Sequence, residues 1–396
     1  AEAVAPLVRS GVRVVDLNIS DNPSQELERI LGQEKFDFVG VNIRNIFFRH
    51  NPQIDQWRSV VRTIKTVLPH SKIVAGGAAF SLLPEEIMAT IEDLDIGVIG
   101  EGEETFLELM HKPLSEVKGI VYRSGSSLNF TPPRERHDFK NLPIPKRDWP
   151  DLDLTRYNML NMQTKRGCVF GCRHCPMSYL EGTTLRFRDL SAIQEEIKYL
   201  DSLGFKKIFF VDNIFNFPMD YSLKVVDILK KFQWEWTGYF KPDFFNKDYI
   251  FALSASGCRN IRISLEGGSD KVHRYLGTSI SVKALLRLLG LSGLLHKHKL
   301  NLSFGIYIGL PGENGIDFLK TLILAFRILL KRHSILFISF WLFPKSEIGE
   351  KFQRSRSLTQ PPFYRKHLAF VFRFLPVLQF KILPKLLGKR VRTGGS

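Results

Sequence analysis

The sequence contains little cysteine, and this scarcity excludes a disulfide-stabilised scaffold. Only four of its 396 residues are cysteines, which favours a reducing, cytoplasmic location. The sequence also lacks a run of about 18 uncharged apolar residues, which argues against a membrane-spanning helix. Neither a signal peptide nor a low-complexity tract is visible. We therefore expect a globular protein, and the chain length favours two domains.

Acidic residues are absent from the end of the chain. Residues 351–396 hold eleven lysines and arginines and no aspartate or glutamate, within a chain that has 56 basic and 40 acidic residues. In residues 367–390 the cations are interspersed with apolar side chains, which favours an anionic membrane surface over nucleic acid as a partner. Pro376 and Pro384 exclude one long helix. The interpretation that we favour over both is that the segment 346–396 covers one side of the fold.

The first third of the chain alternates predicted strands with predicted helices. We expect strands in the ranges 12–17, 36–43, 71–80 and 96–99, and helices in the ranges 24–33, 54–69, 84–93 and 103–110. This alternation predicts a parallel, doubly wound, Rossmann-like α/β domain over residues 1–112. The chain begins without methionine and almost at the first of these strands. We therefore expect that an N-terminal piece is missing.

Glycines are expected at the carboxyl ends of these strands, where doubly wound sheets bind their ligands. Glycine there lets a bulky ligand approach the backbone. One glycine alone is more often explained by a turn, whereas with three glycine positions at one edge a ligand site explains them as well as turns do. The residues concerned are Gly40, Gly76, Gly77, Gly100, Glu101 and Gly102.

Residues 113–158 are rich in proline and charge, and they predict a linker that contains one hairpin near 119–130. In residues 159–345 the alternation of strands and helices resumes. Strands are expected at 157–165, 206–213, 234–240, 260–267, 301–310 and 334–344, with helices at 189–203, 219–232, 247–256, 281–298 and 315–331. Repeated units of this kind predict a partial (β/α)6 TIM-like barrel, with its chemistry at the carboxyl ends of the strands.

Three of the four cysteines, Cys168, Cys172 and Cys175, lie in one loop after the first barrel strand. Structural zinc sites usually take two distant ligand pairs, and the remaining cysteine, Cys258, is alone. Iron–sulfur clusters usually take four cysteines, so three would leave one iron open to another ligand. The spacing favours a 4Fe–4S cluster. The alternatives are a redox thiol site or a zinc site with His174 as a ligand, and Cys258 is expected to be a buried thiol.

The segment CVFGCRHC (168–175) resembles the motif of radical S-adenosylmethionine (SAM) enzymes, and the resemblance extends over about 159–345. Further similar motifs follow in order at FFVDNIFN (209–216), ASGCRNIRISLEGGSD (255–270) and FGIYIGLPGEN (304–314). The first third resembles the cobalamin-binding domain that precedes many radical SAM proteins. The segments TKRGC and DNIFNFP, with Arg186 and Arg188, are similar to a cobalamin-associated branch that includes methyltransferases.

The resemblance implies a role for each matching residue. Cys168, Cys172 and Cys175 would ligate three irons of a 4Fe–4S cluster, and SAM would chelate the fourth. Other residues would contact SAM: His174 the adenine, Asp212 and Asn213 the amino group or ribose, Glu266 the ribose hydroxyls, and Gly309, Pro311 and Gly312 the adenine. The strand-end residues Gly40, Gly76, Gly77, Gly100, Glu101 and Gly102 would hold cobalamin.

The function that the resemblance implies is reductive cleavage of SAM, followed by cobalamin-dependent methyl transfer to an unactivated carbon or phosphorus centre. One alternative is a radical SAM lyase, cyclase or rearrangement enzyme that works without cobalamin. Another is a non-enzymatic iron–sulfur protein. The histidine loop that often follows the first strand of the family's cobalamin domain is not visible. Either the chain lacks that part, or cobalamin binds without a histidine ligand, or it does not bind.

The expected partners follow from the same resemblance and from the basic tail. We expect a small-molecule or lipid-like substrate and an external electron donor of the flavodoxin or ferredoxin type. A peripheral membrane contact through residues 351–396, on the cytoplasmic face, is a further hypothesis. Nucleic acid is not an expected partner.

Overall fold

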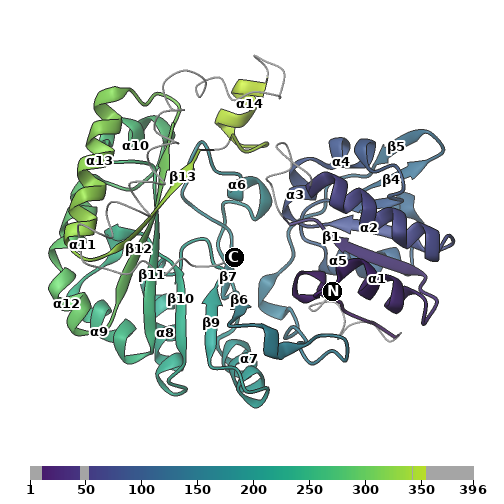
Figure 1. Cartoon of the computed structure of the whole chain (residues 1–396), viewed down its shortest axis with the longest axis horizontal. Helices are drawn as coiled ribbons and strands as arrows, with labels where there is room; N and C mark the ends of the chain where they lie inside the picture. The colour runs from purple at the N-terminus through teal and green to yellow at the C-terminus, as the bar shows by residue number, and fades with distance from the viewer. Residues whose placement is uncertain (1–10, 45–52, 341, 354–396) are drawn as a thin grey trace.

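The structure is a computed structural model that describes residues 11–44, 53–340 and 342–353. Two α/β units lie side by side in it, one built from the first third of the chain and one from the rest (Figure 1). The predictions for the basic tail concern residues that lie almost entirely outside these ranges. Within them, no helix combines the length and the apolar character needed to cross a bilayer.

The first unit is built around a five-stranded sheet in the order β1-β2-β3-β4-β5. Its strands are β1 (Phe38–Asn42), β2 (Lys72–Gly76), β3 (Ile96–Val98), β4 (Ile120–Ser124) and β5 (Ser127–Phe130). Its helices are α1 (Pro23–Leu31), α2 (Gln53–Val67), α3 (Ala78–Leu82), α4 (Pro84–Thr90) and α5 (Glu103–Leu109). The strands β1 to β3 are parallel and alternate with helices, which confirms the Rossmann-like α/β prediction.

The strand expected at Val12–Leu17 is wrong. This segment has irregular backbone and leads into a short 3-10 helix at Leu17–Ile19. Its polar side chains are bound to the region before the second sheet, because Arg13 forms an ion pair with Asp151 at 2.5 Å. The described part of the first unit therefore has three parallel strands rather than four.

The hairpin expected within the linker extends the first sheet. Strand β4 pairs antiparallel with β3, with Ile96 opposite Tyr122, and β5 pairs antiparallel with β4. The turn between them contains Gly125 at a φ of 59°, a conformation that favours glycine. The first sheet thus continues to Phe130, while the boundaries proposed at 112/113 and 158/159 stay predictions.

The second unit has a six-stranded parallel sheet in the order β13-β12-β11-β10-β9-β6. Its strands are β6 (Leu160–Met162), β9 (Lys207–Phe210), β10 (Glu235–Tyr239), β11 (Cys258–Leu265), β12 (Asn301–Ile308) and β13 (Ser334–Ser339). Among the described residues β6 and β13 do not pair with each other, so the sheet stays open. This arrangement confirms the partial barrel.

Helices cover the outer face of this sheet (Figure 1). They are α7 (Leu190–Ser202), α8 (Met219–Lys230), α9 (Lys247–Ala255), α10 (Asp270–Leu276), α11 (Val282–Gly290), α12 (Ser292–Lys297) and α13 (Gly315–Leu330), with α14 (Glu347–Gln353) near the described end. The single helix expected at 281–298 is thus two helices. Gly290, a poor helix former, stands at the break.

The core of the second unit lies between the sheet and these helices, and large aromatic side chains fill it. Phe210, Phe215 and Trp236 are almost fully buried, with ring centroids 4.8 to 5.4 Å apart. The indole N–H of Trp236 donates to the carbonyl oxygen of Ser256 at 3.0 Å, so its polar atom is satisfied. Such a rigid core fixes the strand ends that carry the candidate site.

Candidate active site

The parallel sheet of the second unit brings most of the predicted site residues to one edge. Glu266 follows β11 directly, Gly309 follows β12 directly, and Asp212 lies two residues after β9. The cysteine loop also begins at this edge, after β6. Because the carboxyl ends of parallel strands lie at the same edge, residues distant in the sequence come together here.

A short antiparallel ribbon holds the two ends of the cysteine loop together. Strand β7 (Lys165–Arg166) pairs with β8 (Arg186–Phe187), and the loop between them contains the small helix α6 (Met177–Leu180). Gly167 has a φ of 95°, and a Cβ atom there would lie 2.1 Å from the Thr184 carbonyl oxygen. Only glycine therefore fits where the loop leaves the ribbon.

The three loop thiols are half-buried and free. Burial raises the pKa of Cys172 and of Cys175 to about 12 each, and the nearby Glu266 charge adds to the rise at Cys172. Burial also raises the pKa of Cys168. Thiolates in this environment need a cation to stabilise them, and the irons of a cluster meet that need.

The side chains of the cysteine loop are not gathered around one point. In the described ranges, no three histidine, cysteine, aspartate or glutamate side chains are placed to hold one metal ion. Zinc would require its ligands at about 2.0 to 2.3 Å from one point. In a cubane cluster each cysteine binds a different iron, so the thiols need not converge. The spacing of the loop thiols is therefore compatible with a cluster.

Glu266 is buried and incompletely paired. Its Oε1 lies 3.5 Å from His174 Nε2, and its Oε2 lies 3.8 Å from His273 Nδ1. Neither Glu266 Oε2 nor His174 Nδ1 has a hydrogen-bond partner among the described residues, although both atoms are buried. Buried polar atoms are normally paired, so these two indicate a ligand that supplies hydrogen-bonding groups. Ribose hydroxyls fit Glu266 Oε2.

Asp212 has different surroundings. It is fully buried, and its carboxylate accepts hydrogen bonds from the Thr164 backbone N–H at 2.7 Å and the Thr164 hydroxyl at 2.5 Å. The Lys165 ammonium donates to the same carboxylate at 3.1 Å. These contacts tie β9 to the start of the cysteine loop. The contact with SAM that the resemblance implied for Asp212 stays a prediction.

Asn213 supports the cysteine loop as well. Its amide group donates to Glu181 Oε2 at 2.7 Å and to the Gly167 carbonyl oxygen at 3.3 Å. Glu181 in turn accepts the Gly167 N–H at 3.0 Å. Burial raises the pKa of Glu181. The described contacts of Asn213 thus hold the loop, and its implied contact with SAM is untested.

The glycine-rich turn after β12 is tight. Gly309 and Gly312 have φ values of 73° and 79°, and Pro311 between them is buried. The backbone N–H groups of Gly309 and Leu310 donate to Glu313 Oε2 at 2.8 and 3.2 Å. A Cβ atom on Gly312 would lie 3.4 Å from the Tyr275 ring. Glu313 thus holds the backbone of this turn in place, and the contact of the turn with adenine stays a prediction.

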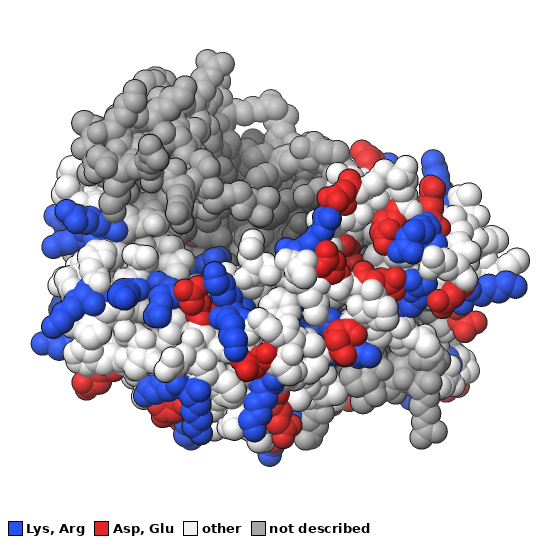
Figure 2. Space-filling model, turned by 60° about the horizontal axis from the view of Figure 1, so that its bottom comes forward, with Lys and Arg blue, Asp and Glu red and all other residues white. Residues whose placement is uncertain are grey.

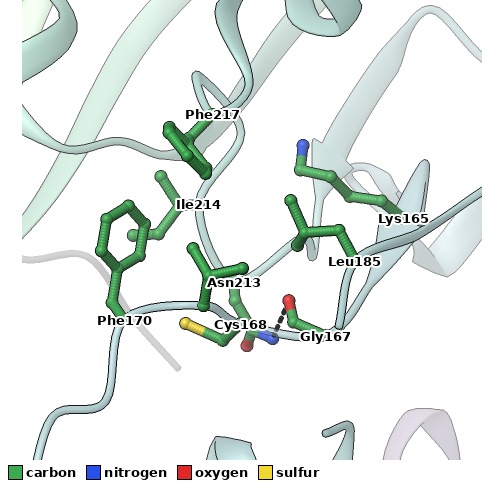
Figure 3. A pocket seen from close by; sticks show the side chains of 9 residues that line it. Lys165, Gly167, Cys168, Phe170, Leu185, Asn213, Ile214 and Phe217 are labelled. Carbon is green, nitrogen blue, oxygen red and sulfur yellow. Dashed lines mark hydrogen bonds between the residues drawn. The ribbon is translucent and has the colours of Figure 1, made fainter. Parts of the chain in front are cut away.

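A pocket lies beside the first loop cysteine. Figure 3 shows the Cys168 sulfur directed toward the side of the pocket formed by Phe170 and Ile214. The rings of Phe170 and Phe217 lie 5.0 Å apart, and Asn213 lies below them. The full lining is Lys165, Gly167, Cys168, Val169, Phe170, Leu185, Asn213, Ile214 and Phe217. The pocket is thus largely apolar with two polar side chains.

Lys241 lies beside the cysteine loop, and the sequence interpretation did not name it. It lies just beyond β10, it is only 3% exposed, and its Nζ donates to Ser279 Oγ at 2.5 Å. The ammonium lies 4.3 Å from the centroid of the Phe170 ring. Burial lowers the pKa of Lys241, while the Asp243 and Cys172 charges oppose that shift. Its place at the carboxyl end of a predicted strand was the signal that would have found it.

The glycines that were predicted to bind cobalamin lie at the carboxyl edge of the first sheet, with one exception. Gly40 lies in the middle of β1 rather than at its end, so its expected position is wrong. Gly76 ends β2, and Gly77 follows with a φ of 101°. Gly100 has a φ of 87°, and a Cβ atom there would meet nothing within 4 Å. A Cβ atom on Gly77 would instead lie 2.3 Å from Asn42 Oδ1, so the open backbone at this edge is at Gly100, and the contact of the edge with cobalamin stays a prediction.

Ion pairs connect the carboxyl edge of the first sheet to the cysteine loop. Glu101 receives two hydrogen bonds from Arg186, at 2.5 and 2.8 Å, and Glu103 receives one from Arg166 at 2.6 Å. The loop Gly100–Gly102 and the cysteine loop consequently lie against each other. Figure 1 shows α6 on the side of the second unit that faces α3, and these two helices are in contact. Glu101 is thus an interdomain residue, and its implied contact with cobalamin is untested.

Two protein families match the chain in the order that the geometry suggests. Residues 1–110 match the B12 binding domain, and residues 162–325 match the radical SAM superfamily. The chain therefore contains a radical SAM domain that follows a B12-binding domain. A radical SAM domain implies a 4Fe–4S cluster and SAM, and the B12-binding domain implies cobalamin.

Individual relatives are similar over part of their length. An uncharacterised methyltransferase of Pyrococcus horikoshii is 25% identical over 70% of this chain and 62% of its own. One of Synechocystis is 30% identical over 47% of this chain, which spans 34% of that relative. The fold resembles the radical SAM methyltransferase TsrM of Kitasatospora setae, solved with cobalamin and a [4Fe–4S] cluster. That comparison gives a TM-score of 0.73 at 19% identity, covering 86% of this chain and 69% of TsrM.

Proposed function

We propose that this protein is a radical SAM methyltransferase that uses cobalamin and methylates an unactivated carbon or phosphorus centre. This proposal rests on the contact between the carboxyl edge of the first sheet, where cobalamin is expected, and the cysteine loop, where the cluster is expected. The pairs Glu101–Arg186 and Glu103–Arg166 hold the glycine-rich carboxyl edge of the first sheet against the cysteine loop of the second unit. Bound at these two edges, the cluster with SAM would supply radical chemistry and cobalamin would supply a transferable methyl group.

The residues have distinct proposed roles. Cys168, Cys172 and Cys175 hold the cluster, which leaves one iron for SAM. Glu266 accepts hydrogen bonds from the ribose hydroxyls through Oε2, which has no hydrogen-bond partner among the described residues. The remaining SAM contacts that we propose are His174, Gly309, Pro311 and Gly312. The proposed cobalamin contacts are Gly76, Gly77, Gly100 and Gly102.

Aromatic side chains favour a reaction space that excludes water. Phe244 lies 5.1 Å from Phe217, and Phe217 lies 5.0 Å from Phe170, between ring centroids. These rings form an apolar wall next to Cys168, and Lys241 supplies a buried cation above it. Radical chemistry requires such a shielded space, because water and stray donors would otherwise quench it. We propose a small-molecule substrate that approaches from this side.

The protein is also proposed to need an external electron donor. The fourth cysteine, Cys258, is fully buried and distant in sequence from the other three. The chain therefore has no cysteines for a second cluster that would deliver electrons. A flavodoxin or ferredoxin type of donor fits this requirement.

The test is an anaerobic assay of the protein loaded with iron, sulfide and hydroxocobalamin. Dithionite and SAM are added, and the nucleoside products are separated by chromatography. We expect SAM to be consumed by the wild type and by Cys258→Ala, but not by Cys172→Ala. Intact cluster absorbance without SAM consumption would contradict an enzymatic role. SAM cleavage without bound cobalamin would instead favour a lyase, cyclase or rearrangement enzyme.

A further inference from the structure

Helix α13 exposes a line of large apolar side chains. They recur every three or four residues, so they form one stripe along the helix. The stripe consists of Ile316, Leu319, Ile323, Phe326 and Leu330, which are 48 to 68% exposed. The opposite face of the helix is buried against the sheet through residues such as Leu324 and Ile328. Helix α13 is therefore apolar on two faces.

This accumulation distinguishes α13 from the other described helices. Of the fourteen large apolar side chains that are exposed in the described ranges, five lie on α13, and no other described helix has more than one. A surface helix normally turns one apolar stripe to the core and a polar face to water. A contiguous second apolar stripe marks a surface that binds something.

Cations flank the stripe. Lys320 and Arg327 each stand four residues after a stripe residue, and Lys331 and Arg332 follow the end of the helix. All four are exposed, and none forms an ion pair with a described residue. The one acidic residue of α13, Asp317, is buried and accepts hydrogen bonds from Ser269 and Lys271.

The surroundings are basic as well. Residues 282–346 contain nine lysines and arginines and two acidic residues. Helix α13 lies on the outer left flank of the molecule in Figure 1, and lysine and arginine side chains predominate along the left flank in Figure 2. The segment that contains the stripe is thus predominantly basic.

The positive charge around the stripe distinguishes between three possible partners, namely residues 354–396, a second copy of the chain and a lipid surface. Residues 354–396 hold ten lysines and arginines and no acidic residue, so their docking on α13 would bring like charges together. Two copies packed through the same stripe would do the same. A lipid surface with anionic headgroups satisfies both features, because it buries apolar side chains and attracts the cations around them.

We propose that α13 is a peripheral membrane-binding face. Its stripe enters the interfacial region of an anionic bilayer, and Lys320, Arg327 and Lys331 contact the headgroups. The helix lies along the surface and does not cross the bilayer. The proposal does not rest on the catalytic function, since binding to vesicles is measured without turnover.

The experiment uses the full chain and two kinds of vesicle, phosphatidylcholine alone and phosphatidylcholine mixed with phosphatidylglycerol. We expect the wild type to sediment with the mixed vesicles only. The variant Lys320→Gln/Arg327→Gln/Lys331→Gln should lose about a hundredfold in partition, at roughly fivefold for each cation near the surface. Leu319→Ser/Phe326→Ser should lose about tenfold or more, because two apolar anchors are removed.

The matched control is Phe130→Ser/Phe251→Ser, which removes two exposed apolar side chains elsewhere, 48% and 43% exposed. It should bind like the wild type, and circular dichroism should show that all variants are folded. Equal binding of the wild type and both stripe variants would overturn the proposal, as would no binding at all.

Two further outcomes would assign the stripe to another occupant and also overturn the proposal. In one, the wild type is a dimer without lipid and Leu319→Ser/Phe326→Ser is a monomer, so that a second copy covers the stripe. In the other, deletion of 354–396 speeds hydrogen exchange in α13 without lipid, so that the tail covers it.

Discussion

Two acidic residues at the carboxyl edge of the second sheet have opposite surroundings. Asp212 is satisfied by Thr164 and Lys165, whereas Glu266 keeps one buried oxygen without a described hydrogen-bond partner. A buried carboxylate oxygen without a hydrogen bond is available to a ligand, whereas a carboxylate whose oxygens all accept hydrogen bonds stabilises the fold. Different substitutions should therefore affect SAM binding and stability separately.

Glu266→Gln should weaken SAM binding without loss of the cluster. We expect about a 10- to 100-fold lower affinity, because a hydrogen bond to a charged group contributes about 1.5 to 3 kcal/mol. Equilibrium dialysis of SAM with the cluster-loaded protein measures this change. Glu235→Gln, on an exposed pair with Lys207, is the control and should leave the affinity unchanged. Equal affinities for both variants would contradict the role of Glu266.

Asp212→Asn should destabilise the fold. The substitution leaves the Lys165 ammonium buried without its counter-ion, which costs about 3 to 5 kcal/mol of the free energy of unfolding. Denaturant titration measures the loss. Asp227→Asn breaks an exposed pair with Lys230 and should cost less than about 1 kcal/mol. Similar losses in the two variants would show that Lys165 does not depend on Asp212.

At the scale of elements, the turns that precede β9 and β11 restrict which side chains can replace their glycines. Gly204 and Gly257 both have a φ of 86°. A Cβ atom on Gly257 would lie 1.9 Å from the Trp234 carbonyl oxygen, whereas one on Gly204 would meet nothing within 4 Å. Gly204→Ala should therefore cost about 1 to 2 kcal/mol in the free energy of unfolding. Gly257→Ala should cost clearly more, and equal melting temperatures would contradict this account.

The contact between the two units gives a second prediction at this scale. Glu101 and Arg186 form a largely buried pair, so a double-mutant cycle with Glu101→Gln and Arg186→Met should give a coupling energy of about 1 to 3 kcal/mol. The exposed pair Asp21–Arg156, which joins the first unit to the segment before the second sheet, should give less than about 1 kcal/mol. A coupling near zero at Glu101–Arg186 would mean that this pair does not hold the edges together.

At the scale of the whole molecule, the order of the strands was largely predictable. The alternation of apolar strands with amphipathic helices dictates parallel pairing, which the second sheet shows throughout. The three loop cysteines and the strand-end Glu266 follow from the same alternation and from the motif. These features are local in the sequence or depend on a regular topology.

Features that depend on a distant partner were not predictable. Val12–Leu17 has the pattern of a strand, but Arg13 is paired with Asp151 and the segment joins no sheet. The hairpin β4–β5 has an ordinary turn signal, and only its pairing with β3 shows that it extends the first sheet. In the same way, the Asp212 carboxylate accepts a hydrogen bond from Lys165 on a neighbouring element. The spacing of these two residues in the sequence does not indicate this contact.

The central claim is that the two units hold cobalamin and a SAM-binding cluster face to face. Electron paramagnetic resonance of the protein loaded with both groups tests it most directly. We predict that reduction of the cluster broadens or splits the cobalt(II) signal of bound cobalamin, and that Cys172→Ala abolishes this effect. A cobalt(II) signal that is the same with and without the reduced cluster, or a protein that binds no cobalamin, would contradict the account.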